Sequence, residues 1–145
     1  MPQRCRLLPD AEQSELLLAT LSRANIASNA ARARLLNEAG ADARAVVREE
    51  VARLGLPAAL GAPITDRVKA QLRGPKFSAY QALTFPPSLA KWPGTDRVTL
   101  VTSAGRRTIP VYVDPTRGDL RAPLAGRAVS LVTRNGEFEL VADGD

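Results

Sequence analysis

The sequence of residues 10–40, DAEQSELLLATLSRANIASNAARARLLNEAG, predicts the longest element of the fold. Asp10, with Gln13 three residues later, matches the capping box that opens many helices. From Leu17 to Leu35, apolar or small residues recur at steps of four and three, which places them on one helical face. Much of this face is Ala or Ser, so another helix or a backbone segment can approach it closely. The glycine at the end of the stretch favours termination of the helix there.

Two shorter helices are expected next. Asp42 can cap the first of them, and Gly55 ends it. Pro63 suits the first turn of the second, and Gly74-Pro75 ends that helix. The apolar positions at helical spacing are Val47, Val51 and Leu54 in the first helix and Ile64, Val68 and Leu72 in the second.

Beyond the helices, a stretch rich in proline and aromatic residues separates helical from alternating periodicity. This stretch, residues 74–94, holds four of the eleven prolines and predicts an extended connector that lies across a surface. Pro110 lies within one of the later alternating runs and argues for an edge strand or a bulge. Asn135-Gly136, between two apolar runs, is the strongest hairpin signal in the chain. The five expected strands are residues 4–7, 98–102, 109–113, 129–131 and 138–140.

Together these elements predict an α+β fold. We expect a small five-strand antiparallel barrel of the oligonucleotide-binding type, with a three-helix bundle inserted after the first strand, because closure of a barrel leaves no exposed strand edge. The expected organisation is a first barrel strand at 1–9, a helical domain at 10–74, a connector at 75–96 and the rest of the barrel at 97–145.

The composition excludes several classes of catalytic site. The 145 residues include no histidine, so a Ser-His-Asp triad, a Cys-His pair and a His-ligated metal site cannot be built. There is no phosphate-loop or dinucleotide-binding glycine motif, and Asp143 and Asp145 lie at a terminus where nothing fixes their geometry. Cys5 is the single cysteine, and we expect it to be a small buried residue. We predict a protein that is not an enzyme and has neither a metal nor a cofactor.

The same observations favour a cytoplasmic protein. No apolar run approaches the ~20 residues that span a bilayer, and the first residues lack the apolar core of an export signal. One cysteine cannot form an internal disulfide, which fits a reducing compartment.

Positive charge is concentrated in the middle of the chain. The net charge of the whole chain is +5, but residues 66–107 carry eight Lys or Arg residues and only two acids. Such a concentration attracts polyanions. An alternative origin for the charge is the arginine-rich composition of a GC-rich genome, since the chain has 17 Arg and 3 Lys.

The basic stretch also contains aromatic residues, and this combination is typical of proteins that bind single-stranded nucleic acid. Cations neutralise phosphates, and aromatic rings accept stacked bases. Phe77, Phe85 and Trp92 are also explained as core residues, whereas the hydroxyl of Tyr80 tolerates exposure. The candidate contacts are Arg67, Lys69, Arg73, Lys76, Tyr80, Arg97, Arg106 and Arg107.

Several short motifs, taken in chain order, resemble one known family. They are Arg6-Leu7-Leu8-Pro9, Asn29 within the long helix, residues 56–60, residues 77–83, the Gly105-Arg106-Arg107 turn before Ile109-Pro110, and residues 128–140. They resemble the N-terminal half of the transposon-encoded RNA-guided nucleases of the TnpB type, which are relatives of the type V CRISPR effectors. Glu137 and Glu139 stand where that family has a lysine and a tyrosine.

The resemblance implies a function in nucleic-acid binding. In the family, a barrel (the wedge domain) and inserted helices (the recognition domain) precede a RuvC-like nuclease that binds Mg²⁺, and nothing in this chain matches that nuclease. The implied function is a non-catalytic module that binds structured guide-type RNA or an RNA–DNA heteroduplex, and possible partners include target DNA. The alternative is a protein-interaction or regulatory fragment that docks on a separately encoded RuvC-like nuclease subunit. A third reading is a truncated reading frame without a function.

Overall fold

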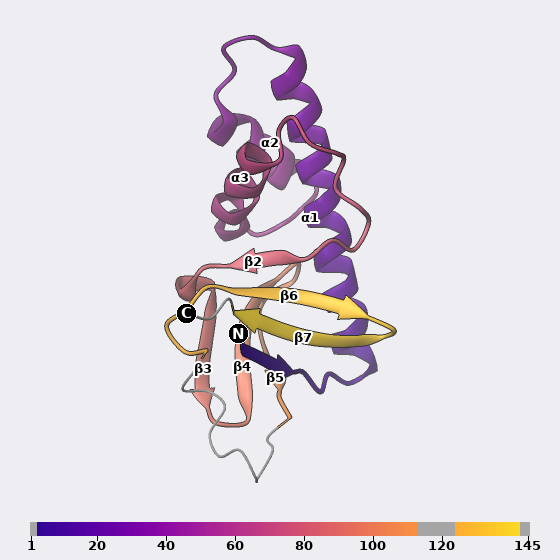
Figure 1. Ribbon diagram of the computed structural model, residues 1–145, viewed down its shortest axis with the longest axis vertical. Coiled ribbons are helices and arrows are strands. Elements are labelled where there is room, and N and C mark those ends of the chain that lie inside the picture. Colours follow the sequence, from indigo (N-terminus) through magenta and orange to yellow (C-terminus); the bar gives the residue numbers. More distant parts are fainter. Residues whose placement is uncertain (1–2, 113–123, 143–145) are drawn as a thin grey trace.

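The computed structural model describes residues 3–112 and 124–142 (Figure 1). These residues contain three α-helices, two short 3₁₀ helices and seven strands. In chain order they are β1 (Gln3–Arg6), α1 (Ala11–Asn37), α2 (Ala43–Arg53), η1 (Ala58–Leu60), α3 (Gly61–Ala70), β2 (Leu83–Phe85), η2 (Pro87–Leu89), β3 (Ala90–Gly94), β4 (Arg97–Thr102), β5 (Gly105–Pro110), β6 (Val129–Arg134) and β7 (Glu137–Ala142). The end of the strand expected at 109–113 and the carboxylates of Asp143 and Asp145 lie outside the described residues.

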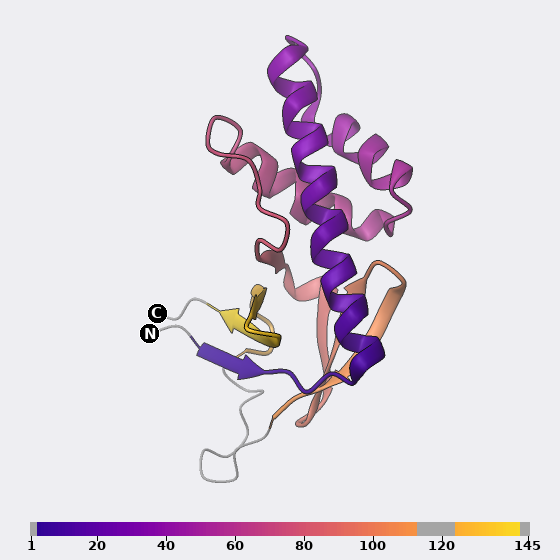
Figure 2. The same ribbon diagram turned by 90° about the vertical axis from the view of Figure 1, so that its right-hand side faces the viewer.

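Helix α1 extends from the strands, where it begins, to the far end of the helical region (Figure 2). The predicted capping box is confirmed, because Gln13 N–H donates to the Asp10 carboxylate (2.8 Å) and Asp10 N–H donates to the Gln13 side chain (3.1 Å). The predicted face is buried from Leu17 to Ala31, and Leu35 is partly buried against the same core. The capping box and the apolar periodicity together therefore located this helix correctly.

Helices α2 and α3 pack against α1 and against each other. Both helices are present, with Val47, Val51, Ile64 and Val68 buried as predicted. The predicted end of the second helix at Gly74-Pro75 was wrong, because α3 ends at Ala70 and Leu72 lies in the turn that follows. Asp42 occupies the N-cap position of α2, but its side chain makes no capping hydrogen bond.

The strands form two antiparallel sheets, in the orders β1-β7-β6-β2 and β3-β4-β5, and not the expected five-strand barrel. One bridge, between Leu7 and Val111, connects the two sheets on one side. On the other side β2 and β3 do not pair, and η2 leads the chain from one sheet to the other. The expectation of a closed barrel was therefore wrong for the described residues.

The two additional strands, β2 and β3, lie within the stretch that was expected to be an extended connector. They are short, and prolines interrupt the alternation that marks a strand. Two other strand predictions are confirmed. Pro110 lies in β5, an edge strand of its sheet. Asn135 and Gly136 have φ values of 55° and 80°, as the tight β6–β7 hairpin requires.

Apolar side chains from the helices and both sheets form one core. Phe77 and Phe85 are buried in it and Trp92 is partly buried against it, as the core interpretation of these residues predicted. Tyr80 differs from them, because half of its surface is exposed.

Cys5 lies in this core and provides a test of the fold. It is 2% exposed, and burial raises the pKa of its thiol to about 11. Because the thiolate is the reactive form, we predict that the native chain reacts with a disulfide reagent at pH 8 at least ~100-fold more slowly than the chain unfolded in guanidinium. Comparable rates in the two states would contradict the burial of Cys5 in the core.

Candidate nucleic-acid interface

The α3–β2 loop, residues 71–82, runs beside α1 (Figure 1). Asn29 on α1 holds its centre with two hydrogen bonds, since the side-chain amide donates to Phe77 O (2.9 Å) and accepts from Phe77 N–H (2.8 Å). An asparagine amide reproduces here the pairing that a neighbouring strand would give to the same backbone groups.

Two further α1 side chains lie on the same stripe of the helix, four residues before and three residues after Asn29. Asn25 donates from its amide nitrogen to Ala79 O and Gln81 O, both at 3.1 Å. Arg32 donates to the backbone carbonyls of Gln71 and Gly74. We call Asn25, Asn29 and Arg32 the α1 clamp, because together they fix the loop backbone along its length.

The loop is also bonded within itself. Gln81 donates from its side chain to the side-chain oxygen of Gln71 (3.1 Å), and Gln71 donates to Pro75 O (2.8 Å). The side-chain oxygen of Gln81 in turn accepts from Ser78 N–H (3.2 Å). The exposed side chains of the loop therefore project from a backbone held on two sides.

The structure brings four of the eight predicted contacts together at this loop. Arg73, Lys76 and Tyr80 are exposed on it, and neither of the two cations forms an ion pair among the described residues. Arg67 lies beneath the loop, with its guanidinium 4.5 Å from the centroid of the Phe77 ring. These residues combine free positive charge with an exposed aromatic ring.

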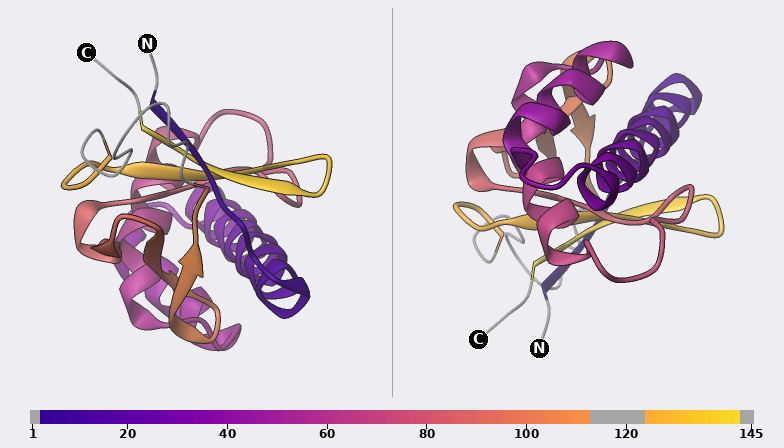
Figure 3. Two further views of the ribbon diagram at one scale, coloured as in Figure 1. Left: turned by 90° about the horizontal axis from the view of Figure 1, so that it is seen from below. Right: turned by 90° about the horizontal axis from the view of Figure 1, so that it is seen from above.

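The other four predicted contacts lie elsewhere. Arg106 and Arg107 are adjacent on β5, where successive side chains project to opposite faces of the sheet, so they cannot share one surface. The turn before them is tied to α1 by a hydrogen bond from Ser103 N–H to Thr20 Oγ1 (2.8 Å). That turn and the α3–β2 loop lie on opposite sides of α1 (Figures 2 and 3). Arg97 is the first residue of β4, where it pairs with Gly94 next to the β3–β4 turn.

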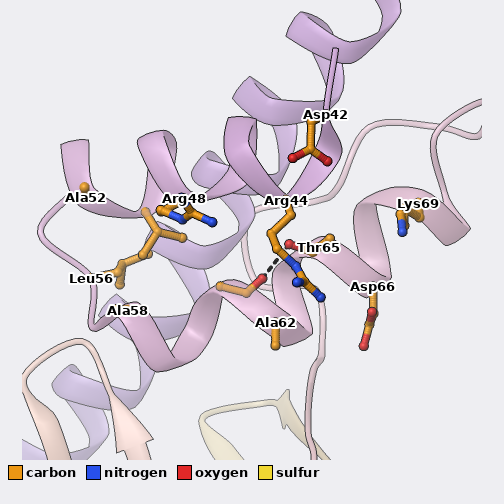
Figure 4. Close-up of a pocket in the computed structure, with 12 residues that line it drawn as sticks. Asp42, Arg44, Arg48, Ala52, Leu56, Ala58, Ala62, Thr65, Asp66 and Lys69 are labelled. Atoms are coloured by element: carbon orange, nitrogen blue, oxygen red, sulfur yellow. Dashed lines mark hydrogen bonds between the residues drawn. The ribbon is translucent and has the colours of Figure 1, made fainter. Parts of the chain in front are cut away.

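Lys69 lines a groove between α2 and α3 (Figure 4). Small side chains such as Ala52 and Ala62 form part of this groove, and charged side chains surround it. Arg44 and Arg48 of α2 also line it, and neither forms an ion pair among the described residues. The groove opens on another side of α3 from the α3–β2 loop, because Lys69 and Arg67 lie about 160° apart around the helix.

Comparison with protein-family models and with curated proteins finds no significant match to the chain. Among the described residues, no group of three His, Cys, Asp or Glu side chains is placed to hold a metal ion. None of the helices in the same part of the chain is long and apolar enough to cross a membrane.

Residue-level reasoning from the sequence did not identify the α1 clamp. The sequence points to Asn29 only through the family resemblance, and none of the predictions from the sequence includes Asn25 or Arg32. A usable signal was present, since asparagine is unfavourable within a helix and Asn25 lies next to the predicted buried face. A buried polar residue in such a place indicates a specific hydrogen-bond partner.

We predict that Asn29→Ala lowers the free energy of unfolding by about 2–3 kcal/mol, because two backbone groups of Phe77 lose their partners. Asn37→Ala is the matched control, since Asn37 is exposed at the end of the same helix, and its effect should stay within about 0.5 kcal/mol. Urea denaturation measures both variants. Equal effects would show that the clamp does not hold the loop.

Proposed function

We propose that the chain is a non-catalytic module that binds structured guide-type RNA as part of a TnpB-like RNA-guided system. The observation that carries the proposal is the α3–β2 loop, which presents Arg73, Lys76 and Tyr80 from a backbone held by the α1 clamp. A surface ordered before binding loses less conformational entropy when a ligand arrives.

The chemistry of these three side chains suits RNA. Arg73 and Lys76 can neutralise backbone phosphates, a term that depends strongly on salt. The ring of Tyr80 can stack on an unpaired base, which contributes about 1–3 kcal/mol per base. Neither phosphate contacts nor stacking distinguish one base sequence from another, so the sequence would be read by base pairing, as in RNA-guided systems.

A large structured RNA also accounts for the cations that the fold separates. Arg97, Arg106 and Arg107 lie away from the α3–β2 loop, and a folded RNA or an RNA–DNA heteroduplex extends far enough to meet more than one face. Lys69 lines the groove between α2 and α3 and is not one of these RNA contacts. Target DNA would enter as the second strand of that heteroduplex. A cytoplasmic location is part of the proposal.

The groove between α2 and α3 favours a second candidate function, docking on a separately encoded RuvC-like nuclease subunit. Its small side chains leave room for a partner helix, and Arg44 and Arg48 beside it have no ion pair of their own among the described residues. The two functions use different surfaces, so variants can separate them.

The first test is to express the chain with its native flanking locus, purify it at about 0.5 M salt and sequence the RNA that remains bound. Salt at this concentration removes most purely electrostatic contacts. We expect one enriched, structured RNA. Recovery of no RNA, or of bulk cellular RNA that the salt removes, would favour docking on a nuclease subunit.

Variants then locate the RNA on the chain. Arg73→Gln with Lys76→Gln should lower the log–log salt slope of RNA affinity by about 1–2, because two phosphate contacts are lost. Tyr80→Ala should weaken binding about tenfold with the slope unchanged. Arg44→Gln with Arg48→Gln removes the same charge from α2 and should leave the slope unchanged. Equal slopes for both double variants would mean that net charge, and not the loop, binds RNA.

A further inference from the structure

Arg67 is the one arginine whose guanidinium is buried without a partner among the described residues. Its Nη1 and Nη2 atoms are both buried and donate to no hydrogen-bond acceptor within residues 3–112 and 124–142. In the part of the chain that the structure describes, the guanidinium forms no ion pair and lies 4.5 Å from the centroid of the Phe77 ring. Burial lowers the pKa of Arg67 to about 10, so the group remains charged at neutral pH.

Such a charge is costly for the fold. A cation–π contact contributes about 2 kcal/mol in a desolvated site, whereas removing a charged group from water costs several kcal/mol. Replacing a buried charge by an apolar side chain of similar volume is often neutral or stabilising. The stability of the fold therefore does not explain an arginine at this position. A binding partner from outside the chain would explain it.

Arg67 lines a cleft between α3, the α3–β2 loop and β2, with a volume of about 550 Å³. The other polar side chains of the cleft already have partners, since Gln71 and Gln81 bond each other and Thr84 bonds Ser130. Asp66 also lines it, but this carboxylate is exposed and makes no ion pair with Arg67. Solvent screens an exposed charge, so Asp66 does not satisfy the guanidinium.

We propose that this cleft is a phosphate-binding site, in which Arg67 turns from the Phe77 ring to hold one backbone phosphate of the bound RNA. The inference rests on the proposed function, because it assigns a further contact to the same RNA. Arginine suits the role, since its planar fork meets two phosphate oxygens at once. Arg73 and Lys76 on the adjoining loop extend the path of positive charge along which a phosphate backbone can run.

The test compares the full chain with Arg67→Met and Arg67→Lys. We expect Arg67→Met to be at least as stable as the original chain in urea, yet to bind the copurified RNA about tenfold more weakly, with the log–log salt slope lowered by about 1. Arg67→Lys keeps the charge without the fork, so affinity should fall while the slope is retained. The Nε–Hε resonance of Arg67 should shift when inorganic phosphate or octauridylate is added to the original chain.

Other results overturn the proposal. If Arg67→Met folds and binds RNA like the original chain, Arg67 has no part in binding. If Arg67→Met does not fold, Arg67→Lys decides, because unchanged RNA affinity in that variant also excludes the site. A failure of the proposed function gives a different result: no RNA binds, while phosphate still shifts the Arg67 resonance.

Discussion

The hydrogen bonds from α1 to the α3–β2 loop are the constraint on which the arrangement of this chain depends. Residues 71–82 belong to no helix or strand, so their backbone groups lack the regular hydrogen bonds of those elements. A buried backbone group that has no hydrogen-bond partner costs about 1–3 kcal/mol. Asn29 supplies both partners for Phe77, whose ring is buried in the core. The chain can therefore pass from the helices to β2 along the side of α1.

This path decides which side chains meet. It covers Arg67 with Phe77 and leaves Tyr80 half exposed. It also leads the chain to β2, which pairs with β6 at the edge of the four-stranded sheet. The β4–β5 turn is held by Thr20 on another side of the same helix. Helix α1 thus supports both the α3–β2 loop and the β4–β5 turn. The proposed RNA contact is on the α3–β2 loop, whose backbone the α1 clamp holds.

Local signals predicted much of the fold, and non-local pairing accounts for what was missed. The capping box at Asp10 and the Asn135-Gly136 turn depend on a few adjacent residues, so the sequence reveals them. Strand β2 has three residues and pairs Leu83 with Leu131, a partner far along the chain. A closed barrel would require β2 to pair with β3, and no local sequence pattern indicates whether two strands pair. The candidate site shows the same limit: charge and aromatic content identified the basic region, but only the fold separates Arg106 from Tyr80 and buries Arg67.

Amide hydrogen exchange of the full chain, with and without the copurified RNA, tests the central claim most directly. The account predicts slow exchange at Phe77 in the free chain, because Asn29 accepts from its N–H group. It also predicts that RNA slows exchange further within residues 71–82 more than at the β4–β5 turn. Rapid exchange at Phe77 in the free chain, or RNA protection confined to other segments, would contradict it.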